Sequence, residues 1–497
     1  MIFEATLVLA ATRLGLSVAG HVNVDRRLSR WAHRHPVRED APDAVARVTW
    51  AVQGVGRRLP GMTCLVQALA AKAMLARRGV PARVRIGVRR SATPTARLDA
   101  HAWLESAPGR VLIGDLPELA DYQPLESATT RLTRQLAALL RGDRVPWAAL
   151  EIDPDALLAF CEDEDLSGLV YRASARGPAG DWPAAFVDRL AHRARLDAAL
   201  EMARGHEIRR VLDALGAAGV RSVLFKGTAL AYSGYAHPAL RPRRDTDLLI
   251  PREHLDAACA TLTSLGYTAS ETSGGDVLFR QLELQRRDAH DVVHAFDVHW
   301  QISNQERFAR MFEDDELWRR AEAVEALGPH ARVAGAADAL LISCVHPVMH
   351  HRDDERLIWI YDTHVIASAM HAGQWSSFVE LARAKAVAAV CLHGLAQARA
   401  RFGTTMPASV GDELAAAART FEPSAEYLTP GRSWRDDVAA NLKALPDWRA
   451  RVRLLWQMAL PSPAYIRRAY SLDRSTLGWI LLPALYAHRG FKAVGRK

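Results

Sequence analysis

The run SVLFKGTALAYSGYAHPALRPRRDTDLLI, at residues 222–250, constrains the fold of this chain more than any other stretch. A short apolar run at 223–225 leads into Lys-Gly-Thr, and a second apolar run at 248–250 follows Asp-Thr-Asp. Alternate residues of a strand point to the same face, so we expect Asp245 and Asp247 to project together. Two carboxylates held that close repel each other unless a cation lies between them.

Other residues of the same run suit a phosphate group. Oxygen ligands favour Mg²⁺, which typically takes one or two carboxylates together with substrate phosphates. We expect a turn at Gly227 and Thr228 that presents backbone N–H groups to a phosphate. Four basic side chains are candidates to neutralise a triphosphate: Lys226, Arg241, Arg243 and Arg244. The run therefore predicts a site for magnesium and a nucleotide.

The length and composition of the chain limit its class. For 497 residues we expect roughly two to four domains. The net charge of +8 favours polyanions such as nucleotides, but it does not by itself argue for DNA, which we do not expect as a partner. The five cysteines show no paired or metal-like spacing, which favours a reducing cytoplasm. No apolar run approaches the length of a membrane span, about 18 residues, so we expect none.

A cysteine at a predicted helix start is the main feature of the first 128 residues. A turn at Pro60 and Gly61 precedes Thr63, which is expected to cap a helix ending at Gly79. Cys64 would lie in the first turn of that helix, where the macrodipole favours the thiolate over the thiol. This position predicts a reactive thiol.

The residues after this helix supply partners for the thiol. Three runs are expected to form strands: 82–88, 98–104 and 110–113. His101 lies in the second run, and Asp115 follows the third. His101 would deprotonate the thiol and later protonate a leaving amine, and Asp115, with Asp121 as the alternative, would hold the tautomer of His101. The layout predicts a transglutaminase-like or papain-like site.

The run CLVQALAAKAMLARRGVPARVRIGV, followed by AHAWLE and a downstream Asp, resembles the protease half of the lasso-peptide biosynthesis protein B. The resemblance covers about residues 1–128. It implies a transglutaminase-like domain that removes the leader from a ribosomally made precursor peptide, with Cys64, His101 and Asp115 as the catalytic residues. Since the protease-like segment starts almost at Met1, we expect a separate leader-recognition protein as a partner, together with a lasso cyclase.

We expect residues 129–205 to be a helical connector that begins the second domain, and residues 206–312 to form its core. Helices are expected in the connector at 132–140, 155–160 and 186–202. In the core, helices are expected at 206–219 and 252–265, and strands at 223–225, at Asp-Thr-Asp, at 277–284 and at 292–300. The last strand reads VVHAFDVHW and places Asp297 and His299 on one face.

This order of elements resembles the polymerase-β-like nucleotidyltransferase superfamily. It is more closely similar to uncharacterised bacterial nucleotidyltransferases with a KG…R…D-x-D-L-L signature and a helical tail, over about residues 130–497. The resemblance implies that Asp245, Asp247 and Asp297 are the metal-binding acids, and that the glycine turn of the family lies at Gly227-Thr228. It also implies Mg²⁺ and an NTP, with ATP expected, and a role for Asp297 in deprotonating an acceptor hydroxyl.

Residues 313–497 are expected to form a helical tail. Its expected helices are 334–348, 357–370, 375–398, 410–421, 435–444 and 448–460. The run HPVMHHRDDE spaces His346 and His350 four residues apart, as in metal-binding helices. No third ligand stands nearby in the sequence, so packing or lining of the nucleotide cleft is favoured.

Together these patterns predict an α+β chain, in which a transglutaminase-like (papain-like) domain precedes a polymerase-β-like nucleotidyltransferase α/β core with a large helical tail. Our hypothesis is a bifunctional peptide-maturation enzyme, a leader-removing cysteine peptidase fused to an Mg²⁺-dependent nucleotidyltransferase that modifies the peptide or its machinery. Two alternatives stay open. In the first, the Cys-His-Asp half transfers an acyl group to an amine and is not a peptidase. In the second, the C-terminal half binds NTP without turnover, as a regulatory module.

Overall fold

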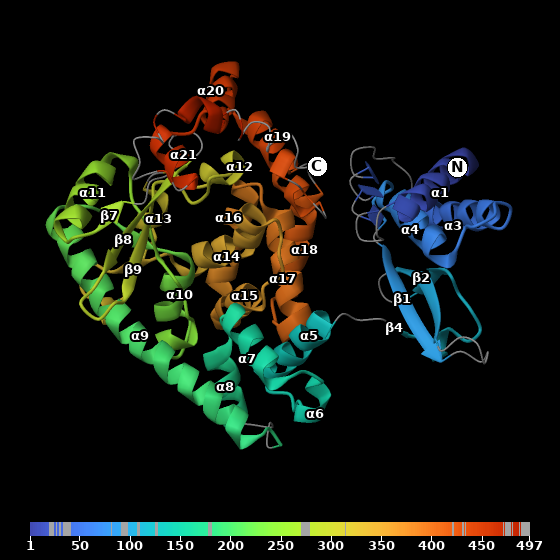
Figure 1. Cartoon of the computed structure of the whole chain (residues 1–497), viewed down its shortest axis with the longest axis horizontal. Helices are drawn as coiled ribbons and strands as arrows, with labels where there is room; N and C mark the ends of the chain where they lie inside the picture. The colour runs from blue at the N-terminus through green and yellow to red at the C-terminus, as the bar shows by residue number, and fades with distance from the viewer. Residues whose placement is uncertain are drawn as a thin grey trace. The chain divides into compact units, whose positions relative to one another are not determined.

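The computed structural model of the chain forms two compact units (Figure 1). The first comprises residues 1–131 and 429–433, and the second comprises residues 132–428 and 434–497. The structure describes residues 1–18, 24–25, 27–28, 31–32, 41–80, 82–90, 98–106, 110–124, 128–176, 181–269, 279–313, 315–419, 422–429, 432, 434–470, 472, 479, 481–486 and 488. Within those ranges, no helix has both the length and the apolar character needed to cross a membrane.

The first unit packs helices against a four-stranded antiparallel sheet of order β3-β2-β1-β4. Its elements are α1 (Ile2–Val18), α3 (Ala41–Gly56), α4 (Cys64–Ala76), β1 (Ala82–Arg90), β2 (Leu98–Ser106), β3 (Arg110–Ile113), η1 (Leu119–Asp121) and β4 (Gln123–Pro124). One core joins the helices to the sheet, and Leu9, Val52, Met74 and Leu104 are fully buried in it. Strands β1, β2 and β3 match the three strands expected after the cysteine helix, and this expectation is confirmed.

The second unit is built on a seven-stranded mixed sheet of order β10-β11-β5-β6-β9-β8-β7. Its strands are β5 (Val223–Leu224), β6 (Thr246–Leu249), β7 (Thr268–Ala269), β8 (Gln281–Arg287), β9 (Val293–His299), β10 (Glu322–Ala323) and β11 (Arg332–Val333). Strand β6 runs parallel to β9 and antiparallel to β5. Residues 277 and 278 of the expected strand 277–284 lie outside the described residues.

Helices surround this sheet and extend into the tail. Those before or beside the sheet are α5 (Ala128–Arg141), α6 (Trp147–Leu150), α7 (Pro154–Asp163), α8 (Ser167–Arg176), α9 (Ala184–Ala217), α10 (Lys226–Ser233) and α11 (Leu255–Ser264). Those after it are α12 (Glu306–Ala309), α13 (Glu316–Arg319), α14 (Ala336–His351), α15 (Leu357–Ala369), α16 (Ala372–Ala384), α17 (Ala388–Phe402), α18 (Ala408–Ala418), α19 (Trp434–Ala444), α20 (Trp448–Ala459) and α21 (Pro463–Ala469). Leu212 of α9 packs with Leu248 and Phe296 of the sheet in one buried cluster.

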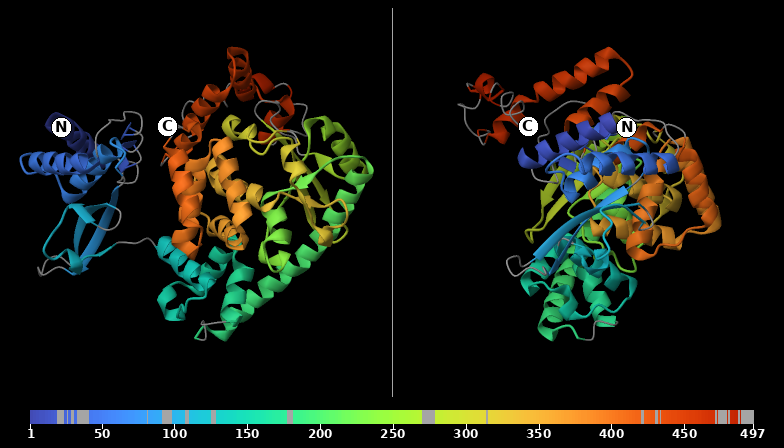
Figure 2. Two further views of the ribbon diagram at one scale, coloured as in Figure 1. Left: turned by 180° about the vertical axis from the view of Figure 1, so that it is seen from behind. Right: turned by 90° about the vertical axis from the view of Figure 1, so that its right-hand side faces the viewer.

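The expected helices 186–202 and 206–219 are in fact one continuous helix, α9, which runs along the edge of its unit (Figures 1 and 2). Gly205 lies inside this helix, although glycine usually weakens one. A Cβ at this position would meet Tyr232 Oη at 2.7 Å. The glycine therefore makes room for a tyrosine from α10 and does not end the helix.

The expected helix 375–398 is instead two helices, α16 and α17. They separate at Ala386, whose φ of +52° lies in the left-handed region. The N–H of Val387 then donates to Ala382 O at 2.9 Å and closes the end of α16. Glycine or asparagine usually marks such an end, so an alanine carries no sequence signal for it.

Glu207 of α9 anchors the helix to the sheet. Its side chain is buried and accepts hydrogen bonds from Arg210, Arg286 and Tyr267. Burial acts to raise the pKa of Glu207, but these partners outweigh it and lower the pKa from 4.5 to about 2. The carboxylate therefore stabilises the fold only while it stays ionised.

We expect Glu207→Gln to lower the stability of the second unit at neutral pH by about 3 kcal/mol, because it leaves the half-buried Arg210 and Arg286 without their charged partner. In the wild type, the contribution of Glu207 is complete above pH 4.5 and is lost as the pH falls towards 2, since the folded-state pKa is the lower one. Thermal unfolding from pH 7 to pH 2 measures both effects. Glu253→Gln, at an exposed glutamate, is the control, and an unchanged midpoint for Glu207→Gln would contradict the assignment.

Candidate functional site

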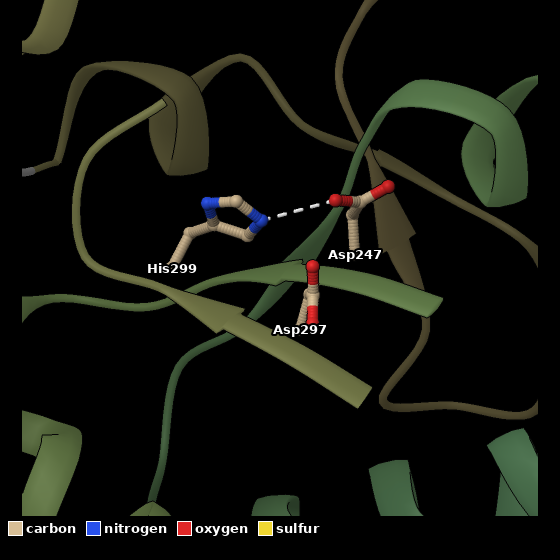
Figure 3. A group of neighbouring side chains, drawn as sticks. All are labelled: Asp247, Asp297 and His299. Atoms are coloured by element: carbon tan, nitrogen blue, oxygen red, sulfur yellow. Dashed lines mark hydrogen bonds and ion pairs between the residues drawn. The ribbon is translucent and has the colours of Figure 1, made fainter. Parts of the chain in front are cut away.

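Two aspartates and a histidine meet where β6 and β9 run side by side. The parallel register sets Asp247 opposite Asp297, and His299 lies two residues further along β9. His299 Nε2 is 3.0 Å from Asp247 Oδ1 (Figure 3). One ligand atom from each of these residues lies within 4.8 Å of one ligand atom from each of the other two. Within the described part of the chain, no other group of three or more His, Cys, Asp or Glu residues comes this close together. Asp247, Asp297 and His299 form a compact set of donors for a cation.

The charges within this group follow from burial and from Lys226. Burial acts to raise the pKa of Asp247, but the Lys226 ammonium, 2.8 Å away, and His299 hold that pKa well below its usual range. Asp247 is thus a carboxylate that can only accept, so His299 donates from Nε2. Burial, and then the charges of Asp247 and Asp245, raise the pKa of Asp297 to about 7. A bound cation would relieve this repulsion.

The donor set fits a hard divalent cation. Asp247 and Asp297 offer carboxylate oxygens, which such cations prefer. His299 is fully buried, and burial followed by the charge of Lys226 lowers its pKa to about 4, so its ring is neutral. Because its Nε2 already donates to Asp247, His299 holds that carboxylate in place, as partners of metal ligands commonly do. The sequence pattern set His299 on the face of Asp297 but assigned it no role.

The turn before α10 lies one residue earlier than expected. Lys226, with a φ of +53°, is the left-handed residue, while Gly227 and Thr228 belong to the first turn of α10. A Cβ on Gly227 would meet only Arg241 at 3.5 Å or more, which is ordinary contact. Thr228 is buried, and its Oγ1 donates to Asp245 O at 3.3 Å. The strained lysine aims its ammonium at Asp247, and this strain marks a candidate functional position.

A cavity of about 540 Å³ opens in front of these residues. Asp245 lies outside the compact donor group but lines the same cavity as Asp247 and Asp297. The side chain of Asp245 reaches solvent through the cavity. Partial desolvation by the surrounding residues, and next the charge of Asp247, raise its pKa. Arg244 is exposed and also lines the cavity. The cavity thus combines acids on the sheet with cations at its rim.

Arg241 and Arg243, which were expected to face phosphate, line the cavity, and each is also buried in an ion pair. Arg241 binds Asp362 of α15 through Nε and Nη2, each 2.8 Å from a carboxylate oxygen. Arg243 binds Glu201 of α9, with Nη1 2.6 Å from Oε2. Both pairs brace the loop that leads into β6. Their partners lie 121 and 42 residues away in sequence, and no local pattern indicates them.

The first unit carries a second candidate site at the start of α4. Cys64 is the first residue of this helix, and the side chain of Thr63 caps it by accepting from Val66 N–H. The N–H of Ala102 on β2 donates to Cys64 Sγ at 3.4 Å. The thiol therefore lies against β2, next to the residue that follows His101. The sulfur of Cys64 is thus placed at the N-terminal end of α4, beside the strand that carries His101.

His101 is oriented by a backbone carbonyl. Its Nε2 lies 2.7 Å from Gly114 O, and because a carbonyl only accepts, Nε2 carries the hydrogen. Gly114 has a φ of +82°, and a Cβ there would meet Ala102 O at 2.7 Å, so glycine is required. Asp115 and Asp121 are both exposed, and among the described residues neither has a hydrogen bond to His101. The expected carboxylate partner of His101 is thus replaced by Gly114 O.

Comparisons with known proteins agree with this geometry. Residues 151–403, slightly more than half of the chain, match a family model described as an uncharacterised nucleotidyltransferase. The chain belongs to this nucleotidyltransferase family. Residues 6–127 match the transglutaminase-like superfamily, which covers the cysteine site. A search of curated proteins found no match. The chain therefore joins a transglutaminase-like domain to a nucleotidyltransferase domain, and the latter implies an NTP substrate and, typically, a divalent metal.

The nucleotidyltransferase domain also contributes a histidine-rich wall to the cavity. His346, His350 and His351 of α14 and Trp359 of α15 line it together with the acids. The ring centroid of His346 lies 5.5 Å from that of His350 and 5.0 Å from that of His351. Burial, followed by neighbouring positive charge, lowers the pKa of His350 to about 3, and His346 is shifted in the same direction. Of the two alternatives favoured for His346 and His350, packing or lining of the cleft, the structure agrees with lining, and both rings are neutral.

Proposed function

We propose that the chain is a bifunctional peptide-maturation enzyme. Its transglutaminase-like domain is a cysteine peptidase that removes the leader of a lasso-type precursor peptide, and its nucleotidyltransferase domain modifies the same peptide or its machinery with Mg²⁺ and ATP. One observation carries the proposal: a single chain holds a thiol beside a histidine-bearing strand, and a pair of aspartates, one buried and one half-buried, aligned on parallel strands. A separate leader-recognition protein and a lasso cyclase are the proposed partners.

In the peptidase, Cys64 is the nucleophile and His101 is the base. His101 donates from Nε2 to Gly114 O, so Nδ1 bears the lone pair that takes the proton of the thiol. The thiolate attacks the peptide carbonyl and forms a thioester, and the amine leaves with the proton from His101. Water then hydrolyses the thioester and restores the thiol. Leader and core peptide are the two products.

In the nucleotidyltransferase, Asp247 and Asp297, with Asp245 on the wall of the same cavity, would hold the Mg²⁺ ion. Bound there, the ion supplies positive charge for the attacking and leaving oxygens of an in-line transfer. His299 keeps the Asp247 carboxylate turned towards the cavity. Asp297 takes the proton of the acceptor hydroxyl as the acceptor oxygen bonds to the α-phosphorus of the NTP, and pyrophosphate leaves.

The cations of the domain divide into two groups. Lys226 and Arg244 line the open cavity and offset the charge of the triphosphate. Arg241 and Arg243 also line the cavity, and their buried ion pairs hold the loop that carries Asp245. Fusion of the two domains raises the effective concentration of the peptide at the second site.

The proposal is tested by incubating the purified chain with the precursor peptide, its recognition protein, ATP and Mg²⁺, and by reading peptide masses. Loss of the leader together with an added nucleotide or phosphate mass is the expected result. Transfer of the acyl group to a supplied amine would favour the acyltransferase alternative. Tight binding of ATP without any added mass would favour a regulatory module in place of the nucleotidyltransferase.

The geometry around His101 predicts unequal effects at two neighbouring residues. Because the ring N–H is held by Gly114 O, Asp115→Ala should lower leader removal less than about tenfold, although a triad aspartate typically contributes about 10⁴-fold. Gly114→Ala should lower it about 100-fold or more, since the added Cβ displaces that carbonyl. Rates of leader release measure both, and circular dichroism checks the fold. A large loss in Asp115→Ala alone would restore Asp115 as the orienting residue.

A further inference from the structure

Helix α20 presents an apolar face that no element covers within the part of the chain that the structure describes. Trp448, Val452, Leu455 and Trp456 lie on this face, spaced as neighbours on one side of a helix. Trp448 is 67% exposed and Trp456 65% exposed, whereas Leu454 is buried against the body of the unit. Tryptophan is highly buried in most folds, so two on one outward face indicate a binding surface.

Arginines border this face on both sides. At about 100° per residue, Arg449 and Arg453 lie along one side of the apolar stripe, and Arg451 lies along the other. An apolar stripe with tryptophans and flanking cations is typical of a helix that lies in the plane of a membrane surface. Figures 1 and 2 show α20 at the outer edge of its unit, where such contact is possible.

A basic cavity of about 540 Å³ adjoins α20. Five arginines line it: Arg252, Arg280, Arg310, Arg449 and Arg453. Its two carboxylates are already engaged, since Glu306 binds Arg280 and Arg310, and Asp447 accepts from Ala450 N–H at the start of α20. The lining therefore carries a net positive charge. Guanidinium groups bind phosphate well, often through two hydrogen bonds.

We propose that α20 and this cavity form a docking site for an anionic phospholipid surface. Trp448 and Trp456 enter the membrane at headgroup level, and the arginines bind lipid phosphates. Charge complementarity selects this occupant, because a second copy of the chain would bring the same arginines together and repel them. The site shares no lining residue with the nucleotide cavity and is independent of the function proposed above.

Vesicle flotation with the full-length chain tests the proposal. We expect binding to mixed phosphatidylcholine–phosphatidylglycerol vesicles at least about tenfold tighter than to phosphatidylcholine alone, and weaker as salt is raised. The double variant Trp448→Glu/Trp456→Glu should bind the mixed vesicles at least about tenfold more weakly than the wild type. Arg449→Gln/Arg451→Gln keeps the apolar stripe and should lose the preference for anionic lipid. Trp50→Glu on α3, 63% exposed in the wild type, is the matched control and should bind normally.

Three outcomes would overturn the proposal. One is equal binding of the wild-type chain to both kinds of vesicle, and another is unchanged binding of the Trp448→Glu/Trp456→Glu variant. The third is a wild-type chain that does not bind vesicles but forms a dimer in light scattering, while the Trp448→Glu/Trp456→Glu variant is a monomer. This result would assign the face to a second copy of the chain. Thermal unfolding of each variant confirms that a loss of binding is not a loss of fold.

Discussion

Asp247→Asn should lower nucleotidyl transfer by about 10³-fold or more and leave leader removal unchanged. Asparagine keeps the shape of the side chain but removes the negative charge that the cation needs, and it leaves Lys226 with a neutral partner at 2.8 Å. Transfer of labelled nucleotide to the peptide measures the loss of activity. Binding of Mn²⁺, followed by electron paramagnetic resonance, should weaken in parallel, because the substitution removes a ligand.

The matched control for this variant is Asp291→Asn. Asp291 is exposed, precedes β9 and has a φ of +67°, which asparagine adopts readily. The same chemical change is thus made outside the cavity. If Asp247→Asn and Asp291→Asn transferred nucleotide at rates within tenfold of each other, Asp247 would not be a ligand and the proposed centre would be wrong.

Cys64→Ala should abolish leader removal, with a loss of about 10⁴-fold or more, because no other group can form the thioester. The position of Cys64 at the start of α4, with Ala102 N–H at 3.4 Å from its sulfur, makes it the nucleophile of the proposed peptidase. Chromatography of the released leader over time measures the rate. Nucleotidyl transfer to a peptide supplied without its leader should proceed normally in this variant.

Cys259→Ala is the control for the loss of a cysteine outside the proposed peptidase site. Both Cys64 and Cys259 are half-exposed, and neither forms a disulfide. Cys259 lies on α11 of the second unit, and its alanine variant should cleave like the wild type. Normal cleavage by Cys64→Ala would show that the peptidase assignment is wrong.

The acids of the nucleotide cavity were predictable because strand geometry is local. Alternation along a strand sets Asp297 and His299 on one face, and apolar residues around each acid mark the strands. That β6 and β9 become parallel neighbours, with Asp247 opposite Asp297, is a property of the whole sheet. The role of His299 depends on this pairing, since its contact is with a residue 52 positions earlier in the chain.

The ion pairs of Arg241 and Arg243 could not be predicted for the same reason. Both arginines line the cavity, where residue type and position suggested that they would meet phosphate, but long-range packing also pairs them with carboxylates from α15 and α9. A guanidinium suits a carboxylate as well as a phosphate, so type alone cannot separate the two partners. Gly114 is a similar case, because its carbonyl orients His101 and a backbone oxygen has no residue signature.

We propose that one chain carries two independent active sites that act on the same peptide. Intact-mass analysis of the precursor peptide after incubation with the wild type, Cys64→Ala or Asp247→Asn, in the presence of the recognition protein, ATP and Mg²⁺, tests this proposal. We expect both mass changes with the wild type, no loss of leader with Cys64→Ala, and loss of leader without added mass with Asp247→Asn. Loss of the leader at the normal rate with Cys64→Ala, or an added mass with Asp247→Asn, would show that the two sites are not as proposed.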